Sequence, residues 1–124
     1  MSLSTDSKIR KQTPIATGVL DYFPDALAAV AEVSRKGNDQ HNPGEPLHWA
    51  KEKSTDHADC IVRHLIDRGK FDTDGTRHSA KAAWRALALL QIEIEQAEPM
   101  TSTEVRETTE RFRGTPGTVV WGNR

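Results

Sequence analysis

Apolar residues recur three and four positions apart in three stretches of the chain, a spacing that is typical of helices with one buried face. The stretches predict helices from Pro24 to about Lys36, from Ser54 or Thr55 to near Gly69, and from about Thr76 to Ala97. Their apolar positions are Ala26, Leu27, Val30, Ala31 and Val33, then Ala58, Ile61, Val62, Leu65 and Ile66, then Ala80, Ala83, Trp84, Leu87, Leu90 and Ile94. The pattern predicts an all-α helical bundle of three main helices.

The third helix carries a second apolar patch beside its main stripe, formed by Ala82, Ala86, Leu89 and Ile92. Two apolar sides predict burial on both, within the bundle and across a subunit interface. Hydrophobic residues make up 35% of the chain, which is low for a compact monomer. We therefore expect a homo-oligomer, most simply a two-fold dimer or a higher assembly.

The other segments set the expected domain limits. Residues 1–13 are polar and predict a flexible tail, residues 14–113 form the all-α domain, and residues 114–124 form a C-terminal tail. Within the domain, Gly37 closes the first helix and residues 37–53 form a loop. Thr101 and Glu104 are spaced as a capping box and predict a peripheral helix over about 102–112.

Composition excludes several classes of protein. The 17 basic and 18 acidic residues give a net charge of −1, whereas proteins that bind nucleic-acid polymers are usually much more basic. No apolar run approaches the roughly 20 residues that span a bilayer, and the N-terminus lacks the apolar core of a signal peptide. A single cysteine, Cys60, precludes an internal disulfide, so we expect a cytoplasmic protein without membrane or nucleic-acid partners.

The stretch from His41 to His78 concentrates the ionisable residues of the chain, including all five histidines. Burying an unpaired ionisable group costs several kcal/mol, so this stretch is either a solvated face or a ligand site. Asp56 and Asp59 lie one helical turn apart, where two carboxylates repel unless a positive charge lies between them. They predict either surface pairing with Arg63 or a magnesium site completed by phosphate and water.

Sequence motifs in the same stretch resemble a known family. The run His41 to Ala50 (HNPGEPLHWA), followed by Asp56-His57-Ala58-Asp59-Cys60 and Arg63-His64-Leu65, resembles the phage-type dATP/dGTP diphosphohydrolase N-terminal domain. That domain is related to the MazG-like all-α nucleotide pyrophosphohydrolases. The resemblance covers roughly residues 14 to 97 and implies a host-cell cytoplasmic location if the chain is of phage origin.

The resemblance implies hydrolysis of a purine deoxynucleoside triphosphate, dGTP or dATP, to the monophosphate and pyrophosphate with Mg²⁺ or Mn²⁺. The wider group holds its metals on E-x-x-E and E-x-x-D pairs from successive helices. Asp56-x-x-Asp59 stands for the second pair, and Glu32 is the one acidic residue at the first, where Ala28, Ala29 and Arg35 depart from the pattern. The predicted catalytic and metal residues are therefore Glu32, Asp56 and Asp59. A surface ion pair with Lys36 is the alternative role for Glu32.

Two further sets complete the predicted site. Charge that develops on phosphoryl oxygens requires fixed cations, for which the candidates are Lys36, Lys51, Arg63 and His64. The base is assigned to the loop residues His41, Asn42, His48 and Trp49, with a structural anchor as the alternative role for Trp49.

Two other functions stay open from sequence. One is a nucleotide-binding or regulatory protein without turnover. The other is a dNTP triphosphohydrolase of the histidine/aspartate type, which uses a transition metal but requires an adjacent His-Asp pair, whereas the order here is Asp56-His57. The segment Asp72-x-Asp74-Gly75 resembles the start of a calcium loop but lacks the later glutamate. Asp74 is therefore expected to cap the next helix. His78 is expected to be a surface or capping residue, with a position facing the site as the alternative.

Overall fold

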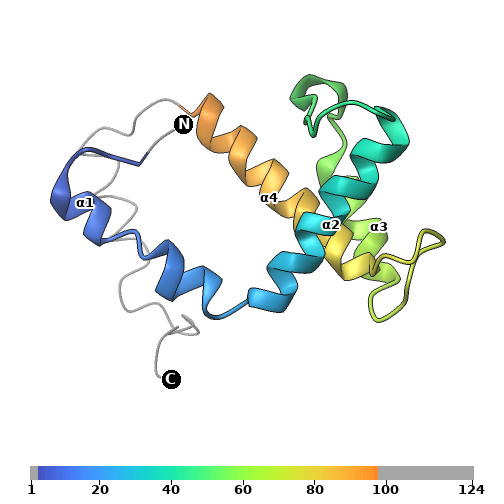
Figure 1. Cartoon of the computed structure of the whole chain (residues 1–124), viewed down its shortest axis with the longest axis horizontal. Coiled ribbons are helices and arrows are strands. Elements are labelled where there is room, and N and C mark those ends of the chain that lie inside the picture. Colours follow the sequence, from blue (N-terminus) through green and yellow to red (C-terminus); the bar gives the residue numbers. More distant parts are fainter. Residues whose placement is uncertain (1–2, 98–124) are drawn as a thin grey trace. The chain divides into compact units, whose positions relative to one another are not determined.

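The computed structural model of the chain describes residues 3–97, and within them the fold is all-α, as the sequence predicted (Figure 1). The main helices are α2 (Pro24–His41), α3 (His57–Ile66) and α4 (His78–Gln96). Three short elements accompany them: α1 (Ser7–Lys11), a π-helix η1 (Ala16–Leu20) and a 3-10 helix η2 (Lys51–Lys53). The predicted peripheral helix over 102–112 and the tail 114–124 lie outside the described residues.

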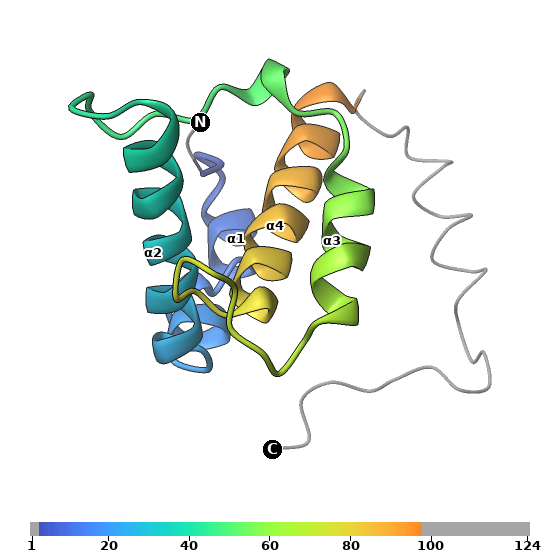
Figure 2. The same cartoon turned by 90° about the vertical axis from the view of Figure 1, so that its right-hand side faces the viewer.

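Helix α4 packs against both other main helices (Figure 2). Toward α2, the Trp84 indole N–H donates to the Ser34 hydroxyl; toward α3, a guanidinium nitrogen of Arg85 lies 3.2 Å from His57 Nδ1. The buried apolar side chains of the described residues are small: Cys60 on α3, and Ala80, Ala82 and Ala88 on α4. Small side chains let helix backbones approach closely, so the helices pack through small buried side chains rather than around a large apolar core.

Helix α2 corrects one expected boundary. It was predicted to close at Gly37, but it continues to His41. A glycine inside a helix costs only about 1 kcal/mol relative to alanine. The buried Asn38 offsets this cost, because its side chain bonds the segment that follows the helix and fixes the last turn. The tail predicted over 1–13 likewise contains α1, which Asp6 caps by accepting from the Lys8 amide at 2.8 Å.

Helix α3 turns a different face inward from the one predicted. The expected apolar stripe is largely exposed, at 56% for Val62, 45% for Leu65 and 69% for Ile66, and Asp56 rather than Ser54 or Thr55 is the N-cap residue. The buried residues are His57 and Cys60. The physical reason is polar pairing: His57 contacts Arg85 and His64 contacts His78, both on α4.

The predicted main stripe of α4 is also divided between core and solvent. Ala80 is buried and Trp84 half-buried, whereas Leu87, Leu90 and Ile94 are each more than half exposed. Apolar faces of this kind agree with the expected homo-oligomer, which stays a prediction; a monomer mass by light scattering would contradict it. No helix in residues 3–97 has the length and apolar character needed to cross a membrane.

Candidate functional site

The connector between α3 and α4 is a tight turn that gathers polar side chains at one place. An isolated antiparallel bridge joins Phe71 to Arg77, and the Asp72 amide donates to the Thr76 carbonyl at 2.8 Å. Gly75 has a φ of 80°, a left-handed conformation that glycine adopts without strain. Asp74 Oδ1 accepts from the Thr76 amide at 3.0 Å, so Asp74 fixes this turn rather than capping α4, which begins at His78.

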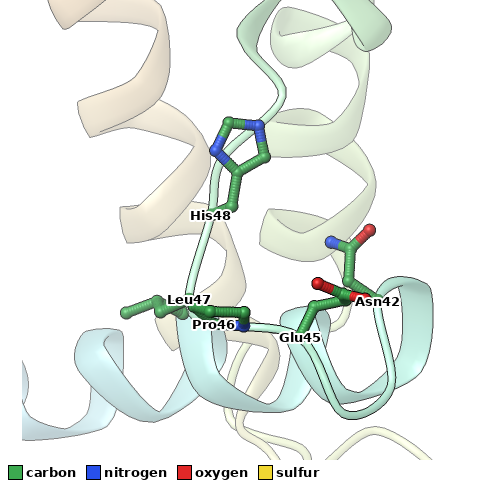
Figure 3. A pocket seen from close by; sticks show the side chains of 5 residues that line it. All are labelled: Asn42, Glu45, Pro46, Leu47 and His48. Atoms are coloured by element: carbon green, nitrogen blue, oxygen red, sulfur yellow. The ribbon is translucent and has the colours of Figure 1, made fainter.

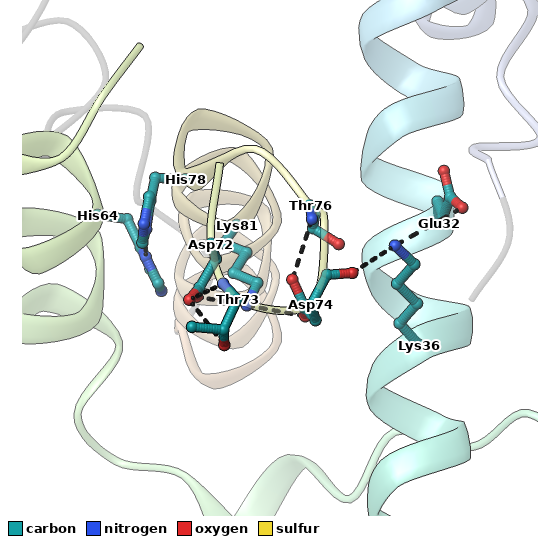
Figure 4. A network of polar contacts seen from close by, with 9 residues as sticks. All are labelled: Glu32, Lys36, His64, Asp72, Thr73, Asp74, Thr76, His78 and Lys81. Carbon is teal, nitrogen blue, oxygen red and sulfur yellow. Dashed lines mark hydrogen bonds and ion pairs between the residues drawn. The ribbon is translucent and has the colours of Figure 1, made fainter. Parts of the chain in front are cut away.

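Two histidines meet beside this turn (Figure 4). His64 Nδ1, from α3, lies 2.9 Å from Nδ1 of His78, the first residue of α4, and the ring centroids are 5.2 Å apart. Burial lowers the pKa of His64 below its usual value, and the neighbouring His78 and Lys81 lower it further. His64 is therefore a neutral imidazole at neutral pH, which offers a lone pair rather than a charge to a ligand.

Lys81 lies between the two carboxylates of the turn. Its Nζ is 2.7 Å from Asp72 Oδ2 and 3.0 Å from Asp74 Oδ2. The hydrogen bond from Lys81, helped by the Thr73 amide, lowers the pKa of Asp72 to about 2. Burial lowers the pKa of Lys81, but the two carboxylates raise it by more, so the net shift is upward. All three groups are ionised at neutral pH and carry a net charge of −1, since two carboxylates face one ammonium.

The predicted phosphate residue Lys36 reaches the same turn from α2 (Figure 4). Its Nζ donates to the Asp74 carbonyl at 2.9 Å and lies 4.0 Å from Glu32 Oε1. The surface ion pair between Glu32 and Lys36 considered from sequence is therefore present, and Glu32, which is half exposed, also pairs with Arg35 at 3.2 Å. Lys36 therefore ties α2 to the connector.

The first turn of α3 holds the predicted carboxylate pair. Asp56 lies 3.5 Å from the Arg63 guanidinium, and its carboxylate accepts from Cys60 Sγ at 3.4 Å. The Cys60 contact is the main cause that lowers the pKa of Asp56, and Arg63 adds to it. Asp59 is exposed. Two carboxylates one turn apart are therefore accessible from solvent at the start of α3, while Arg63 already engages one of them.

The loop after α2 contains an open hollow of about 630 Å³ (Figure 3). Its lining includes Asn42 and His48, two of the four residues predicted to bind the base. His41 is exposed at the end of α2. Trp49 packs edge-on against Trp84, with ring centroids 5.5 Å apart, which agrees with its alternative role as a structural anchor; its role in base binding stays a prediction. Lys51 Nζ lies 5.3 Å from the centroid of the Trp49 ring.

Asn38 holds this loop in place. Its Nδ2 donates to the Glu45 carbonyl at 3.0 Å, and its Oδ1 accepts from the His48 amide at 3.2 Å. We expect Asn38→Ala to lower the free energy of unfolding by about 2 kcal/mol, since buried polar groups lose partners. For a domain of this size that is a fall in Tm of about 8–16 °C, measured by thermal circular dichroism.

A matched control for this variant is Asp39→Ala. Asp39 is the next residue, but its side chain is 62% exposed and pairs only at the surface with Arg35 among the described contacts. Surface pairs contribute at most about 1 kcal/mol. Equal melting temperatures for the two variants would contradict the role given to Asn38.

The structure brings together a different set of possible metal ligands from the predicted one. In residues 3–97, the group of three or more His, Cys, Asp or Glu residues whose ligand atoms lie within 4.8 Å of one another is His64, Asp72 and His78. Glu32, Asp56 and Asp59 form no such group there, and their metal-binding role stays a prediction. Of the phosphate candidates, His64 and Lys36 reach the α3–α4 turn, Arg63 contacts Asp56, and Lys51 lies beside Trp49.

Sequence reasoning did not assign Asp72 and His78 to a site. Asp72 belongs to the incomplete calcium loop, and the sequence favours a surface or capping role for His78 over a position facing the site. One signal in the sequence could have indicated this group. His64, Asp72 and His78 flank a connector that turns at Gly75, and such a tight connector returns the chain to the end of α3.

These contacts describe a small helical domain. Its ionisable side chains gather at the connector between α3 and α4 and beside the polar loop after α2. A family described as dATP/dGTP diphosphohydrolase, N-terminal, matches residues 4–102. The chain belongs to this family, which confirms the resemblance found in its motifs. Comparison with curated proteins and with solved structures gave no match.

Proposed function

We propose that the chain hydrolyses purine deoxynucleoside triphosphates to the monophosphate and pyrophosphate with Mg²⁺ or Mn²⁺. The observation that supports this function is the family match over most of the chain, under a description that names dATP and dGTP. Water supplies the oxygen that bonds to the α-phosphorus, the bond to the bridging oxygen of the β-phosphate breaks, and pyrophosphate leaves. The family description refers to an N-terminal domain, so activity of this chain by itself is part of the proposal.

The residues of the first α3 turn fit a hard divalent ion. Magnesium keeps several waters and is often bound by one or two carboxylates together with phosphate oxygens, so Asp56 and Asp59 provide enough protein ligands. When bound, the ion would offset phosphate charge and lower the pKa of a bound water. Glu32 completes the proposed set from α2, where it now pairs with Arg35.

The cationic side chains have a separate task in this proposal. Arg63 lies on the same helix as Asp56 and Asp59 and presents a planar guanidinium suited to phosphate oxygens. Lys36 and Lys51 are the remaining cationic candidates, and His64, a neutral imidazole at neutral pH, is a phosphate candidate only as a hydrogen-bond donor. The base is assigned to the loop after α2, where Asn42 and His48 line the open hollow and offer hydrogen-bonding groups to a purine edge (Figure 3).

The test is an incubation of the purified chain with each dNTP and NTP, with Mg²⁺, Mn²⁺ or EDTA, followed by separation of products. We expect monophosphate and pyrophosphate from dGTP or dATP, and none with EDTA. Asp59→Asn should lower turnover by roughly 100-fold or more, the scale on which charge-stabilising groups act. Asp67→Asn is the matched control, since Asp67 follows the other end of α3 and pairs with Lys70. Wild-type turnover by folded Asp59→Asn would remove Asp59 from the site.

The grouping of two histidines and an aspartate favours a second candidate function. Transition-metal triphosphohydrolases of the histidine/aspartate type release the nucleoside and intact triphosphate. His64, Asp72 and His78 give a donor set of that kind without the adjacent His-Asp pair. Triphosphate among the products would select this second function, whereas no turnover by folded protein would favour a nucleotide-binding protein.

A further inference from the structure

Three potential ligands converge at the α3–α4 junction from three separate pieces of chain. His64 comes from α3, Asp72 from the connector, and His78 from the start of α4. One ligand atom of each lies within 4.8 Å of the others, and all three side chains are half-buried. In Figure 4 the two imidazole rings face one another and Asp72 lies beside them.

The separation of the two histidine nitrogens suits two ligands of one ion. Each Nδ1 lies 2.9 Å from the other. Two nitrogens bound at about 2.1 Å lie about 3.0 Å apart when the angle at the metal is a right angle, as in octahedral sites, and about 3.4 Å apart in a tetrahedral site. A hydrogen bond between two neutral rings explains the same distance, so the distance alone does not distinguish a metal site from a histidine pair.

The neighbours of Asp72 hold its carboxylate in position. Oδ1 accepts from the Thr73 amide at 2.6 Å, and Oδ2 accepts from Lys81 at 2.7 Å. Each carboxylate oxygen has two lone pairs, so these bonds leave acceptor capacity toward the histidines. Hydrogen bonds that orient ligating carboxylates are a regular feature of metal sites. The negative net charge of Asp72, Asp74 and Lys81 also favours a cation.

We propose that His64, Asp72 and His78 bind one divalent transition-metal ion, such as Zn²⁺ or Co²⁺. Imidazole donors favour such ions over Mg²⁺ and Ca²⁺, which prefer oxygen ligands. Three protein ligands leave at least one coordination position for water or an anionic oxygen. The ion would join α3 to α4 at their common turn. This inference does not depend on the proposed Mg²⁺-dependent hydrolysis, whose metal ligands are other residues, but it takes His64 from the phosphate candidates, and the second candidate function would use the same three ligands.

The test uses the full, untagged chain, stripped with EDTA and dialysed. Co²⁺ is added while its visible absorption is followed, and Zn²⁺ is then used to displace it, with bound metal measured by elemental analysis. We expect one ion per chain. His64→Ala and His78→Ala should each weaken binding by roughly 10- to 100-fold or more, as loss of a ligand or its support does in known sites.

His41→Ala is the matched control, because His41 is exposed at the end of α2 and lies outside the group. It should bind metal like the wild-type chain. Far-UV circular dichroism establishes that each variant is folded, and Asp72→Asn, which keeps size and shape, supplies a second route if a histidine variant unfolds. Asp72→Asn should also weaken binding by at least 10-fold.

Two results would overturn the inference: no Co²⁺ or Zn²⁺ bound by folded wild-type chain at 1:1 stoichiometry, or unchanged affinity in folded His64→Ala and His78→Ala. Neither result depends on turnover. Bound Zn²⁺ without dNTP hydrolysis would support the metal site and contradict the proposed enzyme activity. Mg²⁺-dependent hydrolysis without transition-metal binding would support the enzyme activity and contradict the metal site.

Discussion

Trp84→Ala is expected to lower the free energy of unfolding by about 3 kcal/mol, near the low end for removing a large aromatic side chain. Trp84 is half-buried, packs edge-on against Trp49 and donates to Ser34. The buried apolar side chains of the described residues are alanines and Cys60, so the half-buried Trp84 is a large side chain that joins α2 and the loop to α4. The fall in Tm should be about 12–24 °C.

Two further variants separate the contributions of Trp84. Trp84→Phe keeps an aromatic ring but removes the indole N–H, so it should cost about 1 kcal/mol, the contribution of one hydrogen bond. A double-mutant cycle with Trp49→Ala and Trp84→Ala, measured by urea unfolding, should give a coupling of about 0.5–1.5 kcal/mol for the aromatic pair. Additive effects would show that the two rings do not stabilise one another.

Lys81→Met is expected to lower the free energy of unfolding by about 2 kcal/mol at neutral pH, because it leaves two carboxylates without their shared cation. Lys81, Asp72 and Asp74 are 22%, 26% and 19% exposed, so solvent screens the pair incompletely. Urea unfolding in EDTA measures the effect without bound metal. Arg35→Met is the matched control, since Arg35 also lies between two carboxylates but is 60% exposed.

The effect of Lys81→Met should depend on pH in a defined direction. The pKa of Asp72 is lowered in the folded protein from 3.8 to about 2, so the carboxylate stabilises the fold above the unfolded value. That stability is lost as the pH falls from 3.8 toward 2. The difference between the variant and the wild type should therefore shrink at acid pH, and a difference that stays constant down to pH about 2 would contradict the ionic origin.

The helices could be predicted from sequence, but the faces they bury could not. Spacing of Val62, Leu65 and Ile66 shows that α3 is amphipathic, and the structure confirms the helix. The face of α3 that points inward depends on the partner helix. Here His57 contacts Arg85 and His64 contacts His78, so the edge of α3 that holds these two histidines faces α4. Side-chain pairing between helices is not encoded in the periodicity of either one.

Sequence predicts the parts of the candidate site that local helix geometry fixes, but not the parts that depend on tertiary contacts. Asp56 and Asp59 are close because one helical turn separates them, a relation that local geometry fixes. Asp72 and His78 meet His64 through a connector with Gly75 at positive φ and a bridge between Phe71 and Arg77, which is a tertiary arrangement. The sequence pattern singles out the stretch that holds these residues, whereas the pairing within it required the fold.

The contacts that join the helices differ in how much chain they enclose. His64 and His78 are 14 residues apart, and His57 and Arg85 are 28 apart. Lys36 and Asp74 are 38 apart, and Ser34 and Trp84 are 50 apart. Longer segments lose more entropy on closure, and local contacts form sooner. The α3–α4 hairpin is thus the expected folding nucleus, and α2 docks onto it late, so disturbances of α2 appear mainly as faster unfolding.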